Sequence, residues 1–189
     1  MSVKTYSKAK SGSVKLSANF RVSEFACHDG SDTVIISDEL VALLQKIREH
    51  FGKAVTINSA YRTTAWNAKN GGAPKSQHLL GKAADITIAG VTPLELARYA
   101  EFLGAGGIGL YQSFTHVDVR AARTRWDSRT GVQTAVSGWP GYTEPTELEK
   151  AVDKLAVAGI IDSPDYWKAG SYTANTVQKL LIKLAAAMK

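Results

Sequence analysis

The stretch SQHLLGKAADI, residues 76–86, places a histidine seven positions ahead of an aspartate, with a glycine between them. A catalytic zinc ion typically takes about three protein ligands from histidine and carboxylate side chains and leaves its fourth position to water. His78 and Asp85 can supply two of these ligands, because Gly81 permits the tight path that would bring a loop imidazole and a strand carboxylate together. The alternative is a hydrogen-bonded core histidine and an unrelated strand aspartate.

The third ligand must come from another part of the chain, which has 4 histidines. His50 lies among charged residues near the end of a predicted helix, and His28 lies in the turn-like segment CHDGSD. His116 lies on the alternating strand FTHVDVR, on the same face as Asp118. Two neutral imidazoles and one carboxylate would leave zinc with a net positive charge, able to polarise a carbonyl and to lower the pKa of bound water towards about 7. His116 is therefore the natural third ligand.

The elements that must position these residues can be predicted from the periodicity of the sequence. Amphipathic spacing predicts helices over 37–52 and 92–104, each with a capping residue at its start and a glycine at its end. Alternation of apolar or β-branched residues with polar ones predicts strands over 53–62, 83–90 and 114–120. Strands interspersed with helices in this way predict an α+β fold, a mainly antiparallel sheet with helices packed on one side.

The end of the chain has a different composition. Residues 127–142, DSRTGVQTAVSGWPGY, are rich in glycine, serine and threonine and are predicted to be a linker. Residues 143–189 contain two amphipathic helical segments on either side of IDSPDYWKAGSY, which predicts a small C-terminal helical module. We therefore expect a main domain over 1–126 and a separate module; the alternative is a helical hairpin docked on the main domain.

Composition limits the class of protein. The chain has 189 residues, 44% hydrophobic and 21% charged, and no apolar run of about 18 residues that could span a membrane. Its first residues, MSVKTYSKAKSGSVKLS, have no apolar core, so no secretory signal is predicted. The single cysteine, Cys27, excludes an internal disulfide and a cysteine-rich zinc site.

The net charge of +6 and the pI of about 9.4 favour association with a polyanion, either nucleic acid, an anionic membrane or an acid-rich cell wall. The basic residues are spread along the chain, without a recognition-helix, zinc-finger or aromatic ribonucleoprotein pattern. Nucleic-acid binding is therefore not favoured.

Three segments, SQHLLGKAAD, FTHVDVR and NSAYRTTAWN, resemble the zinc D-alanyl-D-alanine carboxypeptidase family, which also includes phage L-alanyl-D-glutamate endopeptidases and is related to the vancomycin-resistance dipeptidases and the hedgehog signalling domain. The family pattern Ser-x-His-x-x-Gly-x-Ala-x-Asp is met by Ser76, His78, Gly81, Ala83 and Asp85. The resemblance covers roughly residues 16–126. It implies an α+β fold, one zinc ion held by His78, Asp85 and His116, and hydrolysis of peptide bonds in peptidoglycan stems.

The same resemblance assigns Ser59, Tyr61 and Arg62 to the family's Ser-x-Tyr-Arg motif. It makes Arg62 the candidate for steadying the oxyanion or the substrate's carboxylate, a task suited to a fixed charge and a fork of donors. The alternative for Arg62 is a surface ion pair with a nearby acid. Ser76 and Tyr61 are the candidate substrate contacts; the alternative for Ser76 is a purely local hydrogen bond in its turn.

The general base departs from the family pattern. Many relatives place an acidic residue three positions before the last histidine ligand, where this chain has Ser113, and a serine cannot take a proton from water at neutral pH. Asp118 is the nearest acid, about 7 Å along the strand from His116. Asp118 is therefore the candidate base; the alternative is that it orients a metal ligand or Arg62 without touching the metal.

The C-terminal part, residues 151–185, is similar to a short helical module of cell-wall hydrolases and phage lysins of Gram-positive bacteria. This implies a wall-targeting or substrate-positioning role, with Tyr166 and Trp167 as candidate contacts; the alternative is that both aromatic rings pack between the helices. A basic protein suits an anionic wall that bears teichoic acid. The lack of a leader fits a phage enzyme released from the cytoplasm at lysis, and equally well a chain whose leader has been removed.

The leading hypothesis is a zinc peptidase that acts on peptidoglycan stem peptides, either as a carboxypeptidase or as an endopeptidase. A second hypothesis is a non-hydrolytic cell-wall-binding module that retains zinc for structure. The third is a nucleic-acid-binding protein. Oligomeric state and target bacterium are left open.

Overall fold

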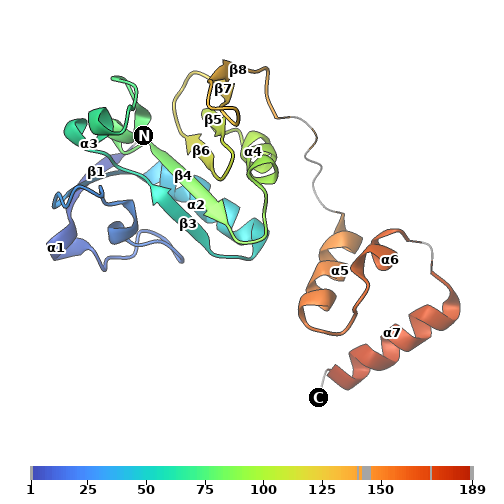
Figure 1. Cartoon of the computed structure of the whole chain (residues 1–189). Coiled ribbons are helices and arrows are strands. Elements are labelled where there is room, and N and C mark those ends of the chain that lie inside the picture. The colour runs from blue at the N-terminus through green and yellow to red at the C-terminus, as the bar shows by residue number, and fades with distance from the viewer. Residues whose placement is uncertain (1, 140, 142–145, 171, 188–189) are drawn as a thin grey trace. The chain divides into compact units, whose positions relative to one another are not determined.

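A six-stranded sheet with the strand order β3-β4-β6-β5-β7-β8 organises the first part of the chain (Figure 1). Its strands are Val55–Ser59 (β3), Ala83–Ile88 (β4), Gly107–Leu110 (β5), Thr115–Asp118 (β6), Thr124–Asp127 (β7) and Thr134–Ala135 (β8). Neighbouring strands are antiparallel except β5 and β7, which run parallel. A separate antiparallel pair joins β1, Val3–Ser7, to β2, Thr33–Ser37. The α+β fold with a mainly antiparallel sheet is thus confirmed.

The computed structural model describes residues 2–139, 141, 146–170 and 172–187. The chain divides into two compact units, residues 1–142 and 143–189. No helix within the described residues is both long and apolar enough to cross a membrane.

Helices α2 and α4 begin and end at residues that suit helix termini. Helix α2, Asp38–Phe51, has two acidic residues in its first turn, where the helix dipole favours negative charge, and ends at Gly52 in the left-handed conformation (φ 61°). Helix α4, Pro93–Phe102, starts with a complete capping box between Thr92 and Glu95. Both helices were expected at these positions and are confirmed.

Both helices pack on one side of the six-stranded sheet. Strand β4 alternates, so that Ala84, Ile86 and Ile88 join one buried apolar cluster with α2 and α4, and Asp85 points to the opposite face. The buried side chains of the helices are Leu40, Val41, Leu43, Leu44 and Ile47 of α2 and Leu96, Ala97, Tyr99 and Ala100 of α4. Each fully buried Leu or Ile contributes about 1.5–3 kcal/mol. The opposite face is thereby left for polar residues.

Several short elements were not expected from the sequence. They are the helices α1 (Lys8–Ser11) and α3 (Thr64–Lys69) and the 3-10 helices η1 (Val22–Phe25) and η2 (Gln77–Leu80). Helix η2 carries His78 and ends at Gly81, whose φ is 64°. A Cβ at Gly81 would lie 2.1 Å from the carbonyl oxygen of Ile35, so the glycine is needed both for its conformation and for the close approach to β2.

The segment 127–142, expected to be a linker, carries structure of its own. Strand β7 ends at Asp127, β8 pairs with it, and Trp139, 8% exposed, packs in the core of the first unit. As far as residue 139 the segment therefore contacts the first unit. The expected start of the helical module at residue 143 lies outside the described residues.

The described residues of the second unit form three helices, α5 (Glu147–Val157), α6 (Pro164–Lys168) and α7 (Ala174–Ala187). Helix α5 begins with the expected capping box between Thr146 and Glu149. On α6, Trp167 packs edge-on against Tyr166 and also contacts the ring of Tyr172, with ring centroids 5.7 and 5.3 Å apart. The three rings form one aromatic group, in which Tyr166 is 43% exposed.

Candidate functional site

The polar site is built on a row of residues that crosses the sheet. In the register of the strands, Asp85 on β4 lies opposite His116 on β6, and His116 lies opposite Gly109 on β5. The row continues to Ser59 on β3 at one end and to Trp126 on β7 at the other. Because directly opposed residues point to the same face, these side chains share the face opposite to α2 and α4.

Three side chains converge in this row and in the adjoining helix η2. The Nε2 atom of His78 lies 3.2 Å from Nδ1 of His116 and 3.3 Å from Oδ1 of Asp85. The Nδ1 atom of His116 lies 2.9 Å from the same Asp85 oxygen. All three residues are buried, with 3–6% of their surface exposed. The structure therefore brings together the three residues expected to bind a metal.

These three atoms fit a tetrahedral metal ion. At ligand distances of about 2.0–2.1 Å, two ligands of a tetrahedral zinc ion lie about 3.3 Å apart, close to the separations found here. The Nδ1 atom of His78 lies 2.6 Å from the carbonyl oxygen of Ala60. Because a carbonyl can only accept, Nδ1 carries the proton and Nε2 presents its lone pair to the other two ligands.

The ionisation of the three ligands follows from burial and mutual hydrogen bonding. Burial lowers the pKa of His78, so its imidazole is neutral at neutral pH. Burial alone would raise the pKa of Asp85, but the hydrogen bond from His116 lowers it overall and keeps the carboxylate ionised. Burial likewise opposes protonation of His116, but its hydrogen bonds with Asp118 and Asp85 raise its pKa. A metal ion would take the place of the proton on the Nδ1 atom of His116.

Arg62 binds Asp85, the carboxylate among the three metal-ligand candidates. Its Nη2 atom donates to Oδ2 of Asp85 at 2.5 Å, and its Nε atom donates to the hydroxyl of Ser59 at 2.8 Å. Oδ1 of Asp85 is then the oxygen that faces the two histidines. The Arg62 side chain is 18% exposed, so part of the guanidinium still reaches the surface of the site.

Asp118 contacts the side of the His116 ring that faces away from the other two ligand candidates. Its Oδ2 atom accepts from Nε2 of His116 at 3.0 Å, on the side of the ring away from Asp85 and His78. The Asp118 side chain is fully buried, and the Nε atom of Arg120 donates to both of its oxygens at 2.9 and 2.8 Å. Burial would raise the pKa of Asp118, but hydrogen bonds from His116 and Arg120 lower it overall. Its carboxylate therefore faces a histidine and an arginine.

The peptidase M15 family matches residues 18–119, which include the three metal-ligand candidates together with Arg62 and Asp118. The chain belongs to the peptidase M15 family. M15 peptidases are metallopeptidases, in agreement with the ligand triangle. The chain is also similar to the probable peptidoglycan L,D-endopeptidase MepK of Haemophilus influenzae, with 38% identity over 77 residues, or 37% of this chain and 41% of that protein. The chain thus spans less than half the length of this M15 relative.

The two expected substrate contacts of this M15 peptidase lie in different surroundings. The Ser76 hydroxyl caps helix η2 and accepts from the backbone N–H of His78 at 3.3 Å. Tyr61 is 9% exposed and belongs to the apolar core, where burial raises the pKa of its hydroxyl. Ser113, which replaces the acid of many relatives, is exposed in the β5–β6 turn. Among the described residues, none of these three hydroxyls hydrogen-bonds to a side chain of the ligand triangle.

Sequence reasoning missed the residues on β5 and β7 that shape the site. A Cβ at Gly107 would lie 2.1 Å from Oδ2 of Asp118, and one at Gly109 would lie 2.3 Å from the indole of Trp126. The signal was present in the sequence GIGL, whose alternation puts apolar residues in the core and glycines on the site face. The glycines clear this face of the M15 domain for the larger side chains of its neighbours.

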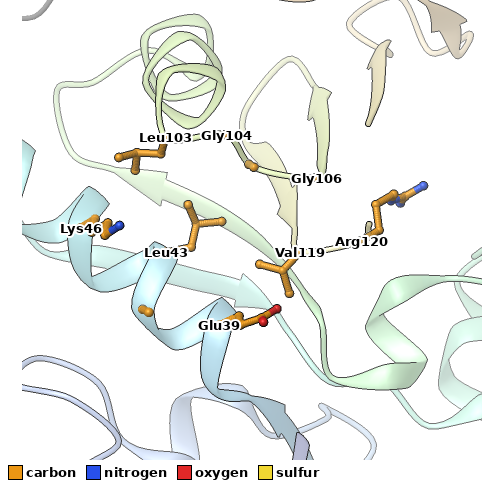
Figure 2. A pocket seen from close by; sticks show the side chains of 10 residues that line it. Glu39, Leu43, Lys46, Leu103, Gly104, Gly106, Val119 and Arg120 are labelled. Atoms are coloured by element: carbon orange, nitrogen blue, oxygen red, sulfur yellow. The ribbon is translucent and has the colours of Figure 1, made fainter. Parts of the chain in front are cut away.

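A pocket of about 330 Å³ lies between α2 and the loops that follow α4 and β6; Figure 2 shows the side chains that line it. Its lining includes the apolar residues Leu43, Leu103 and Val119 and the charged residue Glu39. None of the three metal-ligand candidates of the M15 domain lines it. Arg120, which also binds Asp118, is the point at which the pocket adjoins the site.

Proposed function

We propose that the chain is a zinc-dependent M15 peptidase that hydrolyses a peptide bond in peptidoglycan stem peptides. The observation that carries this proposal is the buried triangle of nitrogen and oxygen atoms from His78, Asp85 and His116, each 2.9–3.3 Å from the others. The similarity to a probable peptidoglycan L,D-endopeptidase supports peptidoglycan as the substrate and an endopeptidase cut in preference to removal of a terminal residue.

The ligand set favours zinc. Two imidazoles and one carboxylate, with room for a fourth ligand, are a common catalytic zinc set. Bound there, zinc would supply Lewis-acid chemistry, by polarising a carbonyl and lowering the pKa of water. Every other contribution to catalysis comes from the side chains around the ligand triangle.

Arg62 supplies fixed positive charge to this site. Its bond to Oδ2 of Asp85 holds that carboxylate in place. Since the guanidinium is partly exposed, its remaining N–H groups can donate to a substrate carboxylate or to negative charge that develops on the scissile carbonyl.

We assign Asp118 a positioning role, acting through His116. Its carboxylate accepts from Nε2 of His116, which fixes the ring so that Nδ1 faces Asp85 and His78. A fully buried carboxylate bound on its other side by Arg120 is better placed for this role than for taking a proton from water.

The second unit has its own proposed role, in binding the cell wall. This proposal rests on the aromatic group that the unit presents, formed by Tyr166, Trp167 and Tyr172. The proposal includes a Gram-positive cell wall as the target and release of the protein by a phage at lysis.

Removal of either histidine tests the metal site. His78→Ala and His116→Ala should each lose bound zinc and reduce cleavage of soluble muropeptides to background, because too few protein ligands then remain to hold the ion. His50→Ala is the matched control, since His50 lies on α2 and stacks on Tyr99 away from the triangle. Cleavage by a zinc-free variant would overturn the proposal. Full zinc occupancy with no cleavage by the unaltered protein would favour the non-hydrolytic wall-binding module.

A further inference from the structure

An aromatic group lies at the β7 end of the site row. The ring of Trp126 is 5.0 Å from the ring of His116, centroid to centroid, and its Nε1–H donates to the hydroxyl of Tyr111 at 3.1 Å. Tyr111 stacks on Phe114, with centroids 4.2 Å apart and planes 11° from parallel. Tyr111 and Phe114 stand at the two ends of the β5–β6 turn, where the backbone N–H of Tyr111 donates to the carbonyl of Phe114.

The sheet register places this group on the same face as the metal ligands. Trp126 lies opposite Gly109, which lies opposite His116. The Nε1 edge of the indole lies over Gly109, because a Cβ built there would be 2.5 Å from that nitrogen. The Tyr111 hydroxyl, bonded to this nitrogen, therefore lies on the site face beside His116, at the end of the row away from Ser59 and Arg62.

The direction of the Trp126 hydrogen bond leaves the hydroxyl with a proton to donate. An indole N–H can only donate, so the Tyr111 oxygen is the acceptor. A tyrosine hydroxyl can also donate one hydrogen bond, and within the part of the chain that the structure describes no acceptor for that proton is found. The residue as a whole is partly exposed.

We propose that the Tyr111 hydroxyl donates a hydrogen bond to a backbone carbonyl of the substrate, on the opposite side of the metal ligands from Arg62. This inference rests on the proposed peptidase function and adds a substrate-binding residue to it. A peptide laid across the row would then meet Arg62 at the β3 end and Tyr111 at the β7 end. Trp126 fixes the hydroxyl by its N–H and Phe114 fixes the ring by stacking, so little side-chain entropy is lost on binding.

The competing explanation is structural. Tyr111 could serve only as the acceptor that satisfies the indole of Trp126, which in turn packs on His116. Tyr111→Phe separates the two roles, because phenylalanine keeps the stack on Phe114 and removes only the hydroxyl. If the hydroxyl is only structural, Tyr111→Phe should change zinc content and thermal stability. If the hydroxyl binds substrate, the variant should change peptide affinity.

The test compares the full-length protein, its Tyr111→Phe variant and Tyr6→Phe, a control on β1 outside the site. Zinc content and melting temperature are measured first. The dissociation constant of a soluble stem tetrapeptide is then measured by calorimetry on protein stripped of metal, so that no cleavage occurs. Finally, kcat/KM is measured on the zinc-loaded protein.

We expect Tyr111→Phe to keep its zinc, to bind the tetrapeptide about 3–10-fold more weakly and to lose at least as much in kcat/KM, as for removal of one neutral hydrogen bond. Tyr6→Phe should match the unaltered protein in all four measurements. Equal peptide affinity and equal kcat/KM in Tyr111→Phe would overturn the inference, as would loss of zinc from that variant. If the unaltered protein neither binds nor cleaves the peptide, the proposed function fails first, a result that differs from failure of the inference alone.

Discussion

The chemistry of the site depends on hydrogen bonds made outside the ligand triangle. The carbonyl of Ala60 fixes the tautomer of His78, and Arg62 leaves one oxygen of Asp85 for the metal. The carboxylate of Asp118 accepts from Nε2 of His116 and so fixes the orientation of that ring. Each ligand thus has one outer partner that sets its orientation, which is the arrangement that most affects metal affinity after the ligands themselves.

Asp118→Asn distinguishes a positioning role from that of a general base. If Asp118 orients His116, the variant should bind zinc about 10–100-fold more weakly, because an amide holds the imidazole N–H less strongly than a carboxylate does. Excess zinc should then restore most of kcat. Zinc affinity is measured by competition with a chelator, and kcat is measured at saturating zinc.

The contrary result is equally clear. Unchanged zinc affinity together with a kcat that stays about 100-fold low at saturating zinc would identify Asp118 as a group that moves a proton. Arg120 would then have to release the carboxylate during the reaction, since it now binds both oxygens.

The metal-ligand candidates could be proposed from the sequence because the spacing of His78 and Asp85 agreed with a family pattern that also includes His116. The orientation of Asp118 could not be predicted. It depends on Gly107, which leaves room for the carboxylate, and on Arg120, which binds it from the far side. The Gly107 contact joins two strands, on which residue spacing along one strand gives no information. Arg120 is only two residues from Asp118, but their spacing does not show that the two side chains bind each other.

At the scale of elements, an ion-pair network ties α4 to β7. The Arg125 side chain is 2% exposed and binds Glu101 near the end of α4. It also donates to the carbonyls of Gly106 and Ala105 at 2.6 and 2.7 Å. A buried guanidinium with this many partners stabilises the fold only while its carboxylate partner is charged.

Glu101→Gln should therefore destabilise the protein in a pH-dependent way. Burial would raise the pKa of Glu101, but hydrogen bonds from Arg125 and Arg123 lower it below its ordinary value of 4.5. A lowered folded pKa contributes stability that is complete above the unfolded pKa and is lost as pH falls through the folded one. We expect the free energy of unfolding of the unaltered protein to exceed that of the variant by about 2 kcal/mol at pH 7. This difference should shrink below about pH 4.

Urea unfolding at a series of pH values measures this difference. Arg129→Gln is a control, because Arg129 pairs with Asp127 at the surface and exposed pairs contribute about 0–1 kcal/mol. A gap for Glu101→Gln that stays constant from pH 7 to about pH 3.5 would contradict the ion-pair explanation.

The elements that sequence could predict are those with local signals. Helices α2 and α4 have caps and amphipathic spacing within their own residues. Strand β8 has two residues, and β7 pairs in parallel with β5 across the sheet, so neither has a local pattern that separates it from a loop. The buried ring of Trp139 likewise depends on tertiary packing and not on the glycine-rich sequence around it.

At the scale of the whole molecule, the chain combines a unit that carries the metal site with a small helical unit. The site residues and their core lie within residues 1–142, and the family match ends at residue 119. The helices of residues 143–189 supply none of the metal-ligand candidates among the described residues. This division suggests separate contributions to cleavage and to wall binding.

Truncation to residues 1–142 tests that division. Because the first unit has its own core, the fragment should bind zinc and cleave soluble muropeptides within about threefold of the full chain. It should co-sediment less with purified cell walls, since the aromatic group of the second unit is gone. Equal wall binding by fragment and full chain would remove the targeting role.

The most direct test of the central claim is mass spectrometry of soluble muropeptides incubated with the purified full-length protein, with and without a zinc chelator. We predict that the stem peptide is separated into two fragments and that the chelator abolishes this cut. Loss of a single terminal alanine would keep the zinc peptidase and change its specificity to that of a carboxypeptidase. Unchanged masses across several wall chemistries, with zinc bound to the protein, would contradict hydrolysis by this site.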